Sequence, residues 1–172
     1  MGKLHKNIPI PTNEIHFMRL DRLDRQLLAL IQDDASLSNA ELANHVNLSV
    51  NACWRRIKRL EDEGLIRKRV ALLSEQALGL GVTVFVNIKT SAHNDEWLEA
   101  FADGVASLPE VVEFYRLSGD TDYLLKVVVQ DIQDYDRVYK QLISIAPLHD
   151  VSSSFAMERI KSSTALPLEH LQ

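Results

Sequence analysis

The chain has 172 residues, of which 46% are hydrophobic and 25% are charged. This apolar content is enough to build a core, which excludes a disordered chain, and no apolar run of about 18 residues could span a bilayer. The single cysteine, Cys53, excludes an internal disulfide framework. Because no basic stretch followed by an apolar segment opens the chain, a cytoplasmic protein is expected.

The formal net charge of −5, taken as an average, argues against a nucleic-acid partner. The charge is unevenly distributed, however. Residues 1–80 carry 12 basic and 10 acidic side chains, whereas residues 81–172 carry 7 and 14. Seven basic residues against three acidic ones lie between Trp54 and Arg69. A local basic patch is therefore expected on an acidic protein.

The first part of the chain predicts three helices. Residues 1–18 contain two prolines and no hydrophobic periodicity, which predicts a flexible extension. From Leu20 onward, apolar residues recur at helical spacing. A second helix is expected to begin at Ser38, as part of a capping box. A third is expected from Ser49, its N-cap, to the residue before Gly64, where a left-handed residue ends a helix.

Three short helices, the last two joined by a tight turn, indicate a helix-turn-helix domain over residues 19–66. The apolar residues of the third helix are expected to pack inward: Val50, Cys53, Trp54, Ile57 and Leu60. Its other face would meet DNA, because Asn can pair with adenine and Arg with guanine in the major groove. An ordinary solvated charged face is the alternative. The residues expected to bind DNA are Ser38, Asn39, Ser49, Asn51, Ala52, Arg55, Arg56, Lys58 and Arg59.

The second half has a different periodicity. Residues 67–80 predict an extended linker that ends in a short turn at Gly79. Strands are then expected at 82–88, 111–117, 123–129 and 151–160, and helices at 95–108 and 133–145. The order strand, helix, strand, strand, helix, strand predicts a ferredoxin-like βαββαβ domain over residues 81–172. The fold class is therefore α+β.

Helices cover only one face of such a sheet. The apolar residues of the first strand alternate, so both of its faces are expected to carry apolar side chains: Val82, Val84, Val86 and Ile88 on one face and Phe85 on the other. A second copy of the chain is the simplest cover for the other face. A homodimer also suits DNA half-sites that lie one helical turn apart.

From Leu20 to Leu168 the chain resembles the Lrp/AsnC, or feast/famine, family of transcription regulators. The resemblance implies a winged helix-turn-helix joined by a hinge strand to an effector-binding and oligomerisation domain called RAM, which is similar to the ACT fold. It also implies dimers that assemble into tetramers or octamers and bind a small amino acid. The CW pair and the SSFAME tail resemble the branch for amino-acid catabolism, which includes cysteine-responsive members. The segments that carry the resemblance are LDRLDRQLLALIQDDASLSNAELANHVNLS, CWRRIKRLEDEGLI, VALLSEQALGLG, LSGDTDYLLKV and SSFAMERIKSSTALPL.

A glycine-aspartate loop and a run of serines are the candidate effector site. Gly119 permits a tight turn, and Asp120 or Asp122 can accept hydrogen bonds from an α-ammonium group. Serine hydroxyls can bind a carboxylate. An ordinary hairpin loop without a ligand is the alternative. The candidate residues are Ser118, Gly119, Asp120, Thr121, Asp122, Tyr123, Ser152, Ser153 and Ser154.

Other chemistry is not indicated. The six histidines lack the spacing of a metal site, and no catalytic motif occurs, so no metal or cofactor beyond the effector is expected. The predicted function is a transcription regulator whose binding to double-stranded DNA, or whose assembly, responds to a small amino acid, without a membrane partner. Two alternatives stay open. One is a small ferredoxin-like enzyme or an amino-acid-binding module without a DNA role. The other is RNA binding, although the central strands offer valine and leucine rather than aromatic residues.

Overall fold

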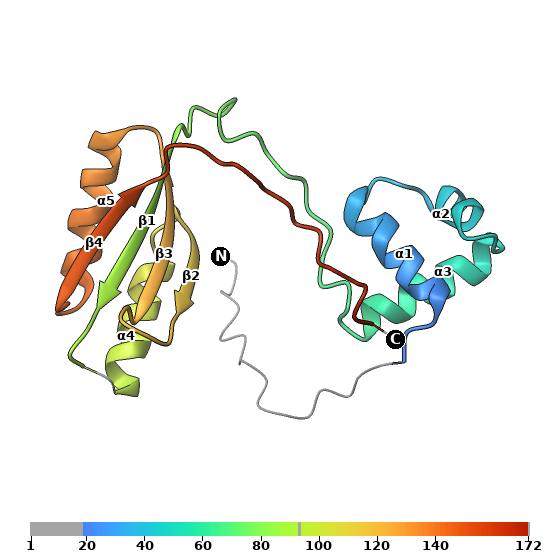
Figure 1. The fold of residues 1–172 in the computed structure, drawn as a ribbon, viewed down its shortest axis with the longest axis horizontal. Helices are drawn as coiled ribbons and strands as arrows, with labels where there is room; N and C mark the ends of the chain where they lie inside the picture. Colours follow the sequence, from blue (N-terminus) through green and yellow to red (C-terminus); the bar gives the residue numbers. More distant parts are fainter. Residues whose placement is uncertain (1–18, 93, 172) are drawn as a thin grey trace. The chain divides into compact units, whose positions relative to one another are not determined.

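The computed structural model describes residues 19–92 and 94–171, and the predicted extension at 1–18 lies outside them (Figure 1). The described chain forms two units. The helical unit holds residues 19–72 and 161–171, and the sheet unit holds the chain from Leu73 to Ile160. The C-terminal segment therefore groups with the helices, although it follows the last strand. None of the helices in the described ranges has the length and hydropathy that a bilayer crossing requires.

The three predicted helices are confirmed. Ser38 donates its backbone N–H to the carboxylate of Glu41 at 2.8 Å and accepts the Glu41 N–H on its hydroxyl at 3.3 Å, which is the expected capping box. Ser49 caps the third helix by accepting the Ala52 N–H at 3.3 Å. The helices are α1 (Arg22–Asp33), α2 (Asn39–His45) and α3 (Val50–Asp62).

The turns around α3 need left-handed residues. Asn47, between α2 and α3, has a φ of 54°, and Gly64, just after α3, has a φ of 76°. The N–H groups of Leu65 and Ile66 both donate to the carbonyl of Leu60, at 3.0 and 3.1 Å. These bonds end the helix and turn the chain into the linker. The linker, residues 67–80, forms no β-strand within the chain. It ends in a turn at Gly79, whose φ is 74°.

The core of the helical unit is a small apolar cluster between the three helices. Cys53 is fully buried there, as predicted, and burial raises the pKa of its thiol. The prediction that Val50 and Trp54 pack inward is wrong, because they are 50% and 51% exposed. α1 and α2 cover only one stripe of α3, and residues one position away lie about 100° around the helix. The buried cluster is Leu27, Ile31, Leu42, Ala43, Val46, Cys53 and Ile57.

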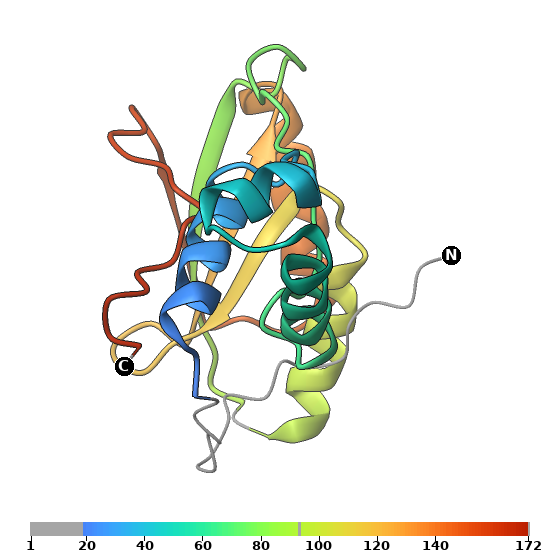
Figure 2. The same cartoon turned by 90° about the vertical axis from the view of Figure 1, so that its right-hand side faces the viewer.

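The sheet unit has the predicted βαββαβ order. Its four strands form one antiparallel sheet in the order β2-β3-β1-β4, and both helices lie on one side of it (Figures 1 and 2). The last strand ends at Phe155, which pairs with Val84, rather than at residue 160. The Ala156 N–H still donates to the Thr83 carbonyl at 2.9 Å, but β1 begins at Val82 and could not pair with a strand that ran to residue 160. The elements are β1 (Val82–Lys89), α4 (Asp95–Ala106), β2 (Val111–Arg116), β3 (Tyr123–Val129), α5 (Ile132–Ile145) and β4 (Asp150–Phe155).

Aromatic side chains from both the helices and the strands fill the core of the sheet unit. Trp97 and Phe101 of α4 stack with ring centroids 4.9 Å apart, and Phe114 of β2 meets Phe101 edge-on at 5.8 Å. Tyr123 is part of the same group, with its ring 5.8 Å from that of Trp97. These contacts bury one face of the sheet under α4.

The other face of the sheet is mixed: on β1 it carries the apolar Phe85, as predicted, among polar residues. The valines at 82, 84 and 86 and Ile88 all point to the helices, because side chains alternate along a strand. On the opposite face of β1, Phe85 is 37% exposed, and its cross-strand neighbour on β3 is Lys126. Lys126 in turn pairs with Glu113 at 3.0 Å.

Candidate nucleic-acid interface and ligand site

The solvent face of α3 presents polar, basic and aromatic side chains. Asn51, Trp54, Arg55 and Lys58 are exposed on this face. They begin within the first turn after the N-cap, where a recognition helix reaches base edges. The face therefore combines an amide, two cations and an exposed aromatic ring at the end of the helix that DNA would meet.

Arg56 and Arg59, which were also expected on this face, bind carboxylates of α1 and its cap. Arg56 donates to Asp21 at 2.6 Å and to Asp24 at 2.8 Å. Arg59 donates to the second oxygen of Asp24 at 2.6 Å. Asp24 is only 1% exposed, so its charge is matched by two guanidinium groups at the contact between α1 and α3.

The expected exposure of Arg56 is therefore wrong: its side chain is 27% exposed and turned toward α1. It lies about 100° around the helix from Arg55, which is enough to move it from the open face to the packed side. The hydrogen bonds to Asp24 and Asp21 raise the pKa of Arg56. The pKa of Asp21 is lowered, first by the Asp24 backbone N–H and then by Arg56. These ion pairs fix the rotation of α3.

The cations that remain for a partner are fewer than the sequence predicts. Within the described ranges, no carboxylate lies within 4.0 Å of Arg55. Lys58 pairs with Asp62 at 2.6 Å, but both side chains are more than half exposed. Such a surface pair is worth little and exchanges readily for a phosphate. Arg55 and Lys58 are thus the available cations of α3.

Two of the predicted residues at the helix starts, Ser38 and Ser49, are N-caps. The Ser38 hydroxyl contacts the Glu41 carboxylate at 2.7 Å, which lowers the pKa of Glu41 together with the Ser38 N–H. Asn39 begins α2 and is half-buried, and Ala52 lines a shallow groove with three arginines of α3. Their contact with DNA stays a prediction.

In the sheet unit, the candidate loop joins β2 to β3. Gly119 has a φ of 132°, a conformation that favours glycine. Asp122 fastens the loop to the end of β1: its N–H donates to the Ile88 carbonyl at 3.0 Å, and its carboxylate accepts the Thr90 N–H at 2.8 Å. Asp120 is exposed and makes no hydrogen bond within the described residues. Asp120, and not Asp122, is therefore the carboxylate open to a ligand.

The three candidate serines of β4 do not lie on one face of the sheet. The hydroxyl of Ser153 contacts the hydroxyl of Tyr135 on the helix side. Ser152 and Ser154 point to the opposite face, next to Asn87 and Phe85 of β1. Alternation along the strand makes this unavoidable for consecutive residues. Ser152 and Ser154 are the hydroxyls that remain accessible.

The structure gives Tyr123 a packing role in place of the predicted ligand contact. It is 4% exposed and belongs to the aromatic core, and burial raises the pKa of its phenol. A tyrosine after a loop and before an alternating strand can point to either face of the sheet. The sequence contained no signal that decided between them.

The loop and the serines share one end of the sheet, but the strand that follows the loop is not a neighbour of the strand that carries the serines. Ser152 is the partner of Asn87 on β1, and Asn87 is also the partner of Leu124, which follows the loop on β3. Two strand spacings separate them, which is about 10 Å. One chain therefore supplies two separate, solvent-open halves of the candidate site. Among the described residues no cluster of three or more His, Cys, Asp or Glu side chains could hold a metal ion.

Comparisons with known proteins match both units. Residues 20–67 match a family model described as winged helix-turn-helix DNA-binding, and residues 83–166 match the Lrp/AsnC ligand binding domain. The glutamate uptake regulatory protein of Zymomonas mobilis is 53% identical over 87% of this chain and 92% of its own length. The DNA-binding transcriptional activator DecR of Escherichia coli is 51% identical over 87% of this chain and 99% of its own.

Two solved structures are also similar. An AsnC family transcriptional regulator from Agrobacterium tumefaciens has a TM-score of 0.86 and 53% identity, over 89% of this chain and 100% of that one. A transcriptional regulator from Neisseria meningitidis, solved in complex with L-Met, has a TM-score of 0.85 and 38% identity, over 89% of this chain and 99% of that one. The order of the two units is thus shared along the whole length of these proteins.

Proposed function

Because the chain belongs to the Lrp/AsnC family of transcription regulators, we propose that it reads DNA with the open face of α3 and binds a free amino acid at the end of its sheet. The relatives are regulators and not enzymes, which answers the alternative of a small ferredoxin-like enzyme. The observation that carries the proposal is the division of the α3 cations. Two are bound by α1, and the others face solvent beside Asn51.

In this proposal Asn51 and Arg55 meet base edges in the major groove. The amide of Asn can pair with adenine and the guanidinium of Arg with guanine, and each good bidentate contact discriminates by about 1–3 kcal/mol. Lys58 and the N-cap Ser49 lie at the flanks, where phosphates are the expected partners. Arg56 would act indirectly, by keeping α3 in the rotation that points Arg55 outward.

The amino acid would bind between copies of the chain. Asp120 can accept hydrogen bonds from the α-ammonium group, and Ser152 can donate one to the carboxylate. Because β1 lies between β4 and the strand that follows the Asp120 loop, we infer that a compact ligand needs the loop of one copy and β4 of another. The support is the about 10 Å separation in the sheet and the L-Met bound to the Neisseria relative. We propose a homodimer that assembles further into tetramers or octamers.

The DNA part is tested by selecting duplexes from a random library with the full chain. Affinity for a selected and a scrambled duplex is then measured at one salt concentration. Arg55→Ala should weaken the selected duplex about 10- to 100-fold and the scrambled one much less. Lys140→Ala, which removes an exposed cation of the sheet unit, is the control and should change neither. Equal affinity of the unaltered chain for both duplexes would refute sequence-specific binding.

The ligand part is tested by a thermal-shift screen of the common amino acids with light scattering for assembly state. A ligand at about 100 times its Kd stabilises the folded state by about 2.7 kcal/mol, which gives a clear rise in Tm. Asp120→Ala should abolish this rise while leaving the Tm without ligand unchanged. If Asp120→Ala keeps the full rise, the ammonium group binds elsewhere.

A further inference from the structure

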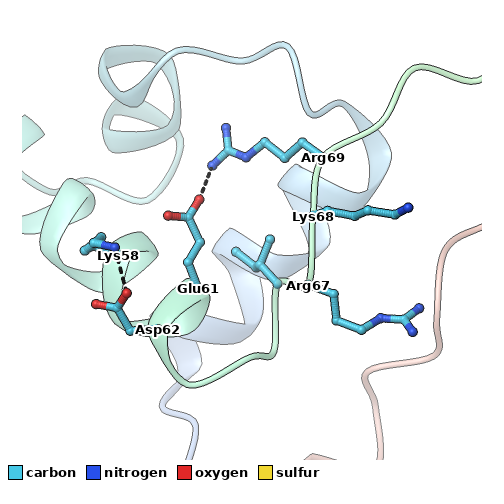
Figure 3. A pocket seen from close by; sticks show the side chains of 7 residues that line it. Lys58, Glu61, Asp62, Arg67, Lys68 and Arg69 are labelled. Carbon is cyan, nitrogen blue, oxygen red and sulfur yellow. Dashed lines mark hydrogen bonds and ion pairs between the residues drawn. The ribbon is translucent and has the colours of Figure 1, made fainter. Parts of the chain in front are cut away.

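A second basic cluster follows α3 and is not used by the function proposed above. Three consecutive cations, Arg67, Lys68 and Arg69, begin the linker, and all three are exposed. They lie beside the last two turns of α3 around a shallow hollow (Figure 3). The hollow is lined by Lys58, Glu61, Asp62, Ile66, Arg67, Lys68 and Arg69.

The acidic residues of the hollow are occupied by other cations. Glu61 accepts a hydrogen bond from Arg69 at 3.2 Å, and Asp62 accepts one from Lys58 at 2.6 Å. For Arg67 and Lys68, no carboxylate lies within 4.0 Å in the described part of the chain. Figure 3 shows both side chains extending away from the two acidic residues. Two positive charges are therefore left without compensation at one place.

The segment that carries these two charges is anchored on both sides. Ile66, just before it, packs against the core of the helical unit and donates its N–H to the Leu60 carbonyl at 3.1 Å. Arg69, just after it, is held by Glu61 on α3. The backbone of Arg67 and Lys68 is thus held at the C-terminal end of α3, and their exposed side chains extend from it. A segment whose backbone is already positioned loses less conformational entropy when it binds.

The position of this cluster on α3 favours the DNA backbone over the bases. The C-terminal end of α3, at Asp62, lies about 16 Å from Asn51, at 1.5 Å per residue. A recognition helix contacts base edges with its N-terminal residues, and much of the remaining DNA-facing surface contacts the backbone. With Asn51 at a base edge, a cluster at the opposite end of α3 is therefore better placed for phosphates.

We propose that Arg67 and Lys68 form a second DNA-binding site, which binds backbone phosphates flanking the bases read by α3. The inference rests on the proposed DNA reading by α3. Its chemistry is charge complementarity: two uncompensated cations on a shallow and mostly polar surface suit a polyanion. Such contacts strengthen binding to every sequence and add no discrimination.

The test is the double variant Arg67→Ala/Lys68→Ala in the full chain. Affinities for the selected and the scrambled duplex are measured between about 50 and 200 mM salt. Each lost phosphate contact removes about 0.9 from the slope of log affinity against log salt, so the slope should fall by about 1.8. Both duplexes should weaken by the same factor, and their affinity ratio should stay unchanged.

Two controls separate a local contact from net charge. Arg67→Lys/Lys68→Arg keeps both charges and should keep the original slope. Arg137→Ala/Lys140→Ala removes two exposed cations from α5 of the sheet unit and should also keep it. Circular dichroism of each variant checks that the helices are intact.

The outcomes are distinguishable from failure of the proposed function. If the unaltered chain does not distinguish the two duplexes, the proposed function fails. If it does, and the alanine variant keeps the full salt slope, only the second site is overturned. If the ratio of the two duplex affinities changes, the cluster acts by positioning α3. If the alanine variant keeps the salt slope but changes self-association, the cluster binds an acidic surface of another copy of the chain. Either result would also overturn the inference.

Discussion

The two units are stabilised by different chemistry. In the helical unit, a nearly fully buried carboxylate, Asp24, joins α1 to α3 through Arg56 and Arg59, beside a small apolar cluster. In the sheet unit, four aromatic rings and β-branched strand residues form the core. Among the described residues, Asp24 is the one charged side chain classed as buried.

The difference follows from what each unit binds. A helix that reads DNA must carry positive charge, and unbalanced positive charge destabilises a small three-helix fold. Asp21 and Asp24 neutralise the cations on the packed side of α3, which leaves the open side basic. In the described part of the sheet unit no charged side chain is buried, and apolar packing forms its core. The predictions below perturb one unit at a time.

The largest effect is expected in the sheet unit from Phe101→Ala. Phe101 is fully buried and touches Trp97 and Phe114, so its removal should cost about 3–5 kcal/mol of unfolding free energy. The chain has two tryptophans, one in each unit. In a Trp54→Phe background, Trp97 fluorescence therefore follows the sheet unit in urea. A loss below about 1 kcal/mol would contradict the role of the aromatic core.

The next effect is expected in the helical unit from Asp24→Ala. Removing one partner of a buried ion pair costs about 3–5 kcal/mol, but Arg56 and Arg59 are 27% and 43% exposed and can rehydrate. We therefore expect about 2–3 kcal/mol, measured by hydrogen exchange of α1 and α3 amides. Asp62→Ala, which breaks only the exposed pair with Lys58, is the control and should cost under about 1 kcal/mol. If Asp24→Ala and Asp62→Ala lowered the unfolding free energy equally, the buried ion pairs of Asp24 would not be what stabilises the helical unit.

A smaller loss is expected in the sheet unit from Gly104→Ala. Alanine is a better helix former by about 1 kcal/mol, which predicts stabilisation of α4. A Cβ at this position would, however, lie 2.3 Å from Cγ2 of Ile145, a branch that cannot swing away freely. Overpacking costs about 1–3 kcal/mol, so the net loss should be about 1–2 kcal/mol. In an Ile145→Ala background the steric clash is absent, so adding Gly104→Ala should no longer cost stability. If Gly104→Ala alone stabilised the protein, the close contact between α4 and Ile145 would be contradicted.

The smallest effect is expected from Gln32→Ala in the helical unit. The Gln32 side chain donates to the Leu166 carbonyl and accepts the Leu166 N–H, both at 3.0 Å, and so holds the C-terminal segment to α1. Losing these exposed hydrogen bonds should cost about 1 kcal/mol and speed limited proteolysis after residue 160. Gln26→Ala, at an exposed position of the same helix, is the control and should leave the rate of this cleavage unchanged. Unchanged cleavage in Gln32→Ala would show that Arg25, which contacts the Leu171 carbonyl, suffices.

The sequence by itself determined the local structure and the order of the elements. The capping box at Ser38, the cap at Ser49 and the left-handed Gly64 depend on neighbours within a few residues. The β-branched and aromatic residues of β1 and the apolar run of β3 likewise located these strands. These signals predicted both units, because helix and strand periodicity is written in consecutive residues.

Only the tertiary structure decided which way individual side chains point. Arg55 and Arg56 are adjacent in sequence, yet one faces solvent and the other faces Asp24, because α1 lies on one side of α3. Ser152 and Ser153 are divided in the same way by the pleat of β4 and the helices behind it. The direction of a side chain depends on which element packs against its own, and that neighbour lies far away along the chain. The periodicity of the sequence therefore identified the two functional regions, and the packing of the elements selected the residues available in each.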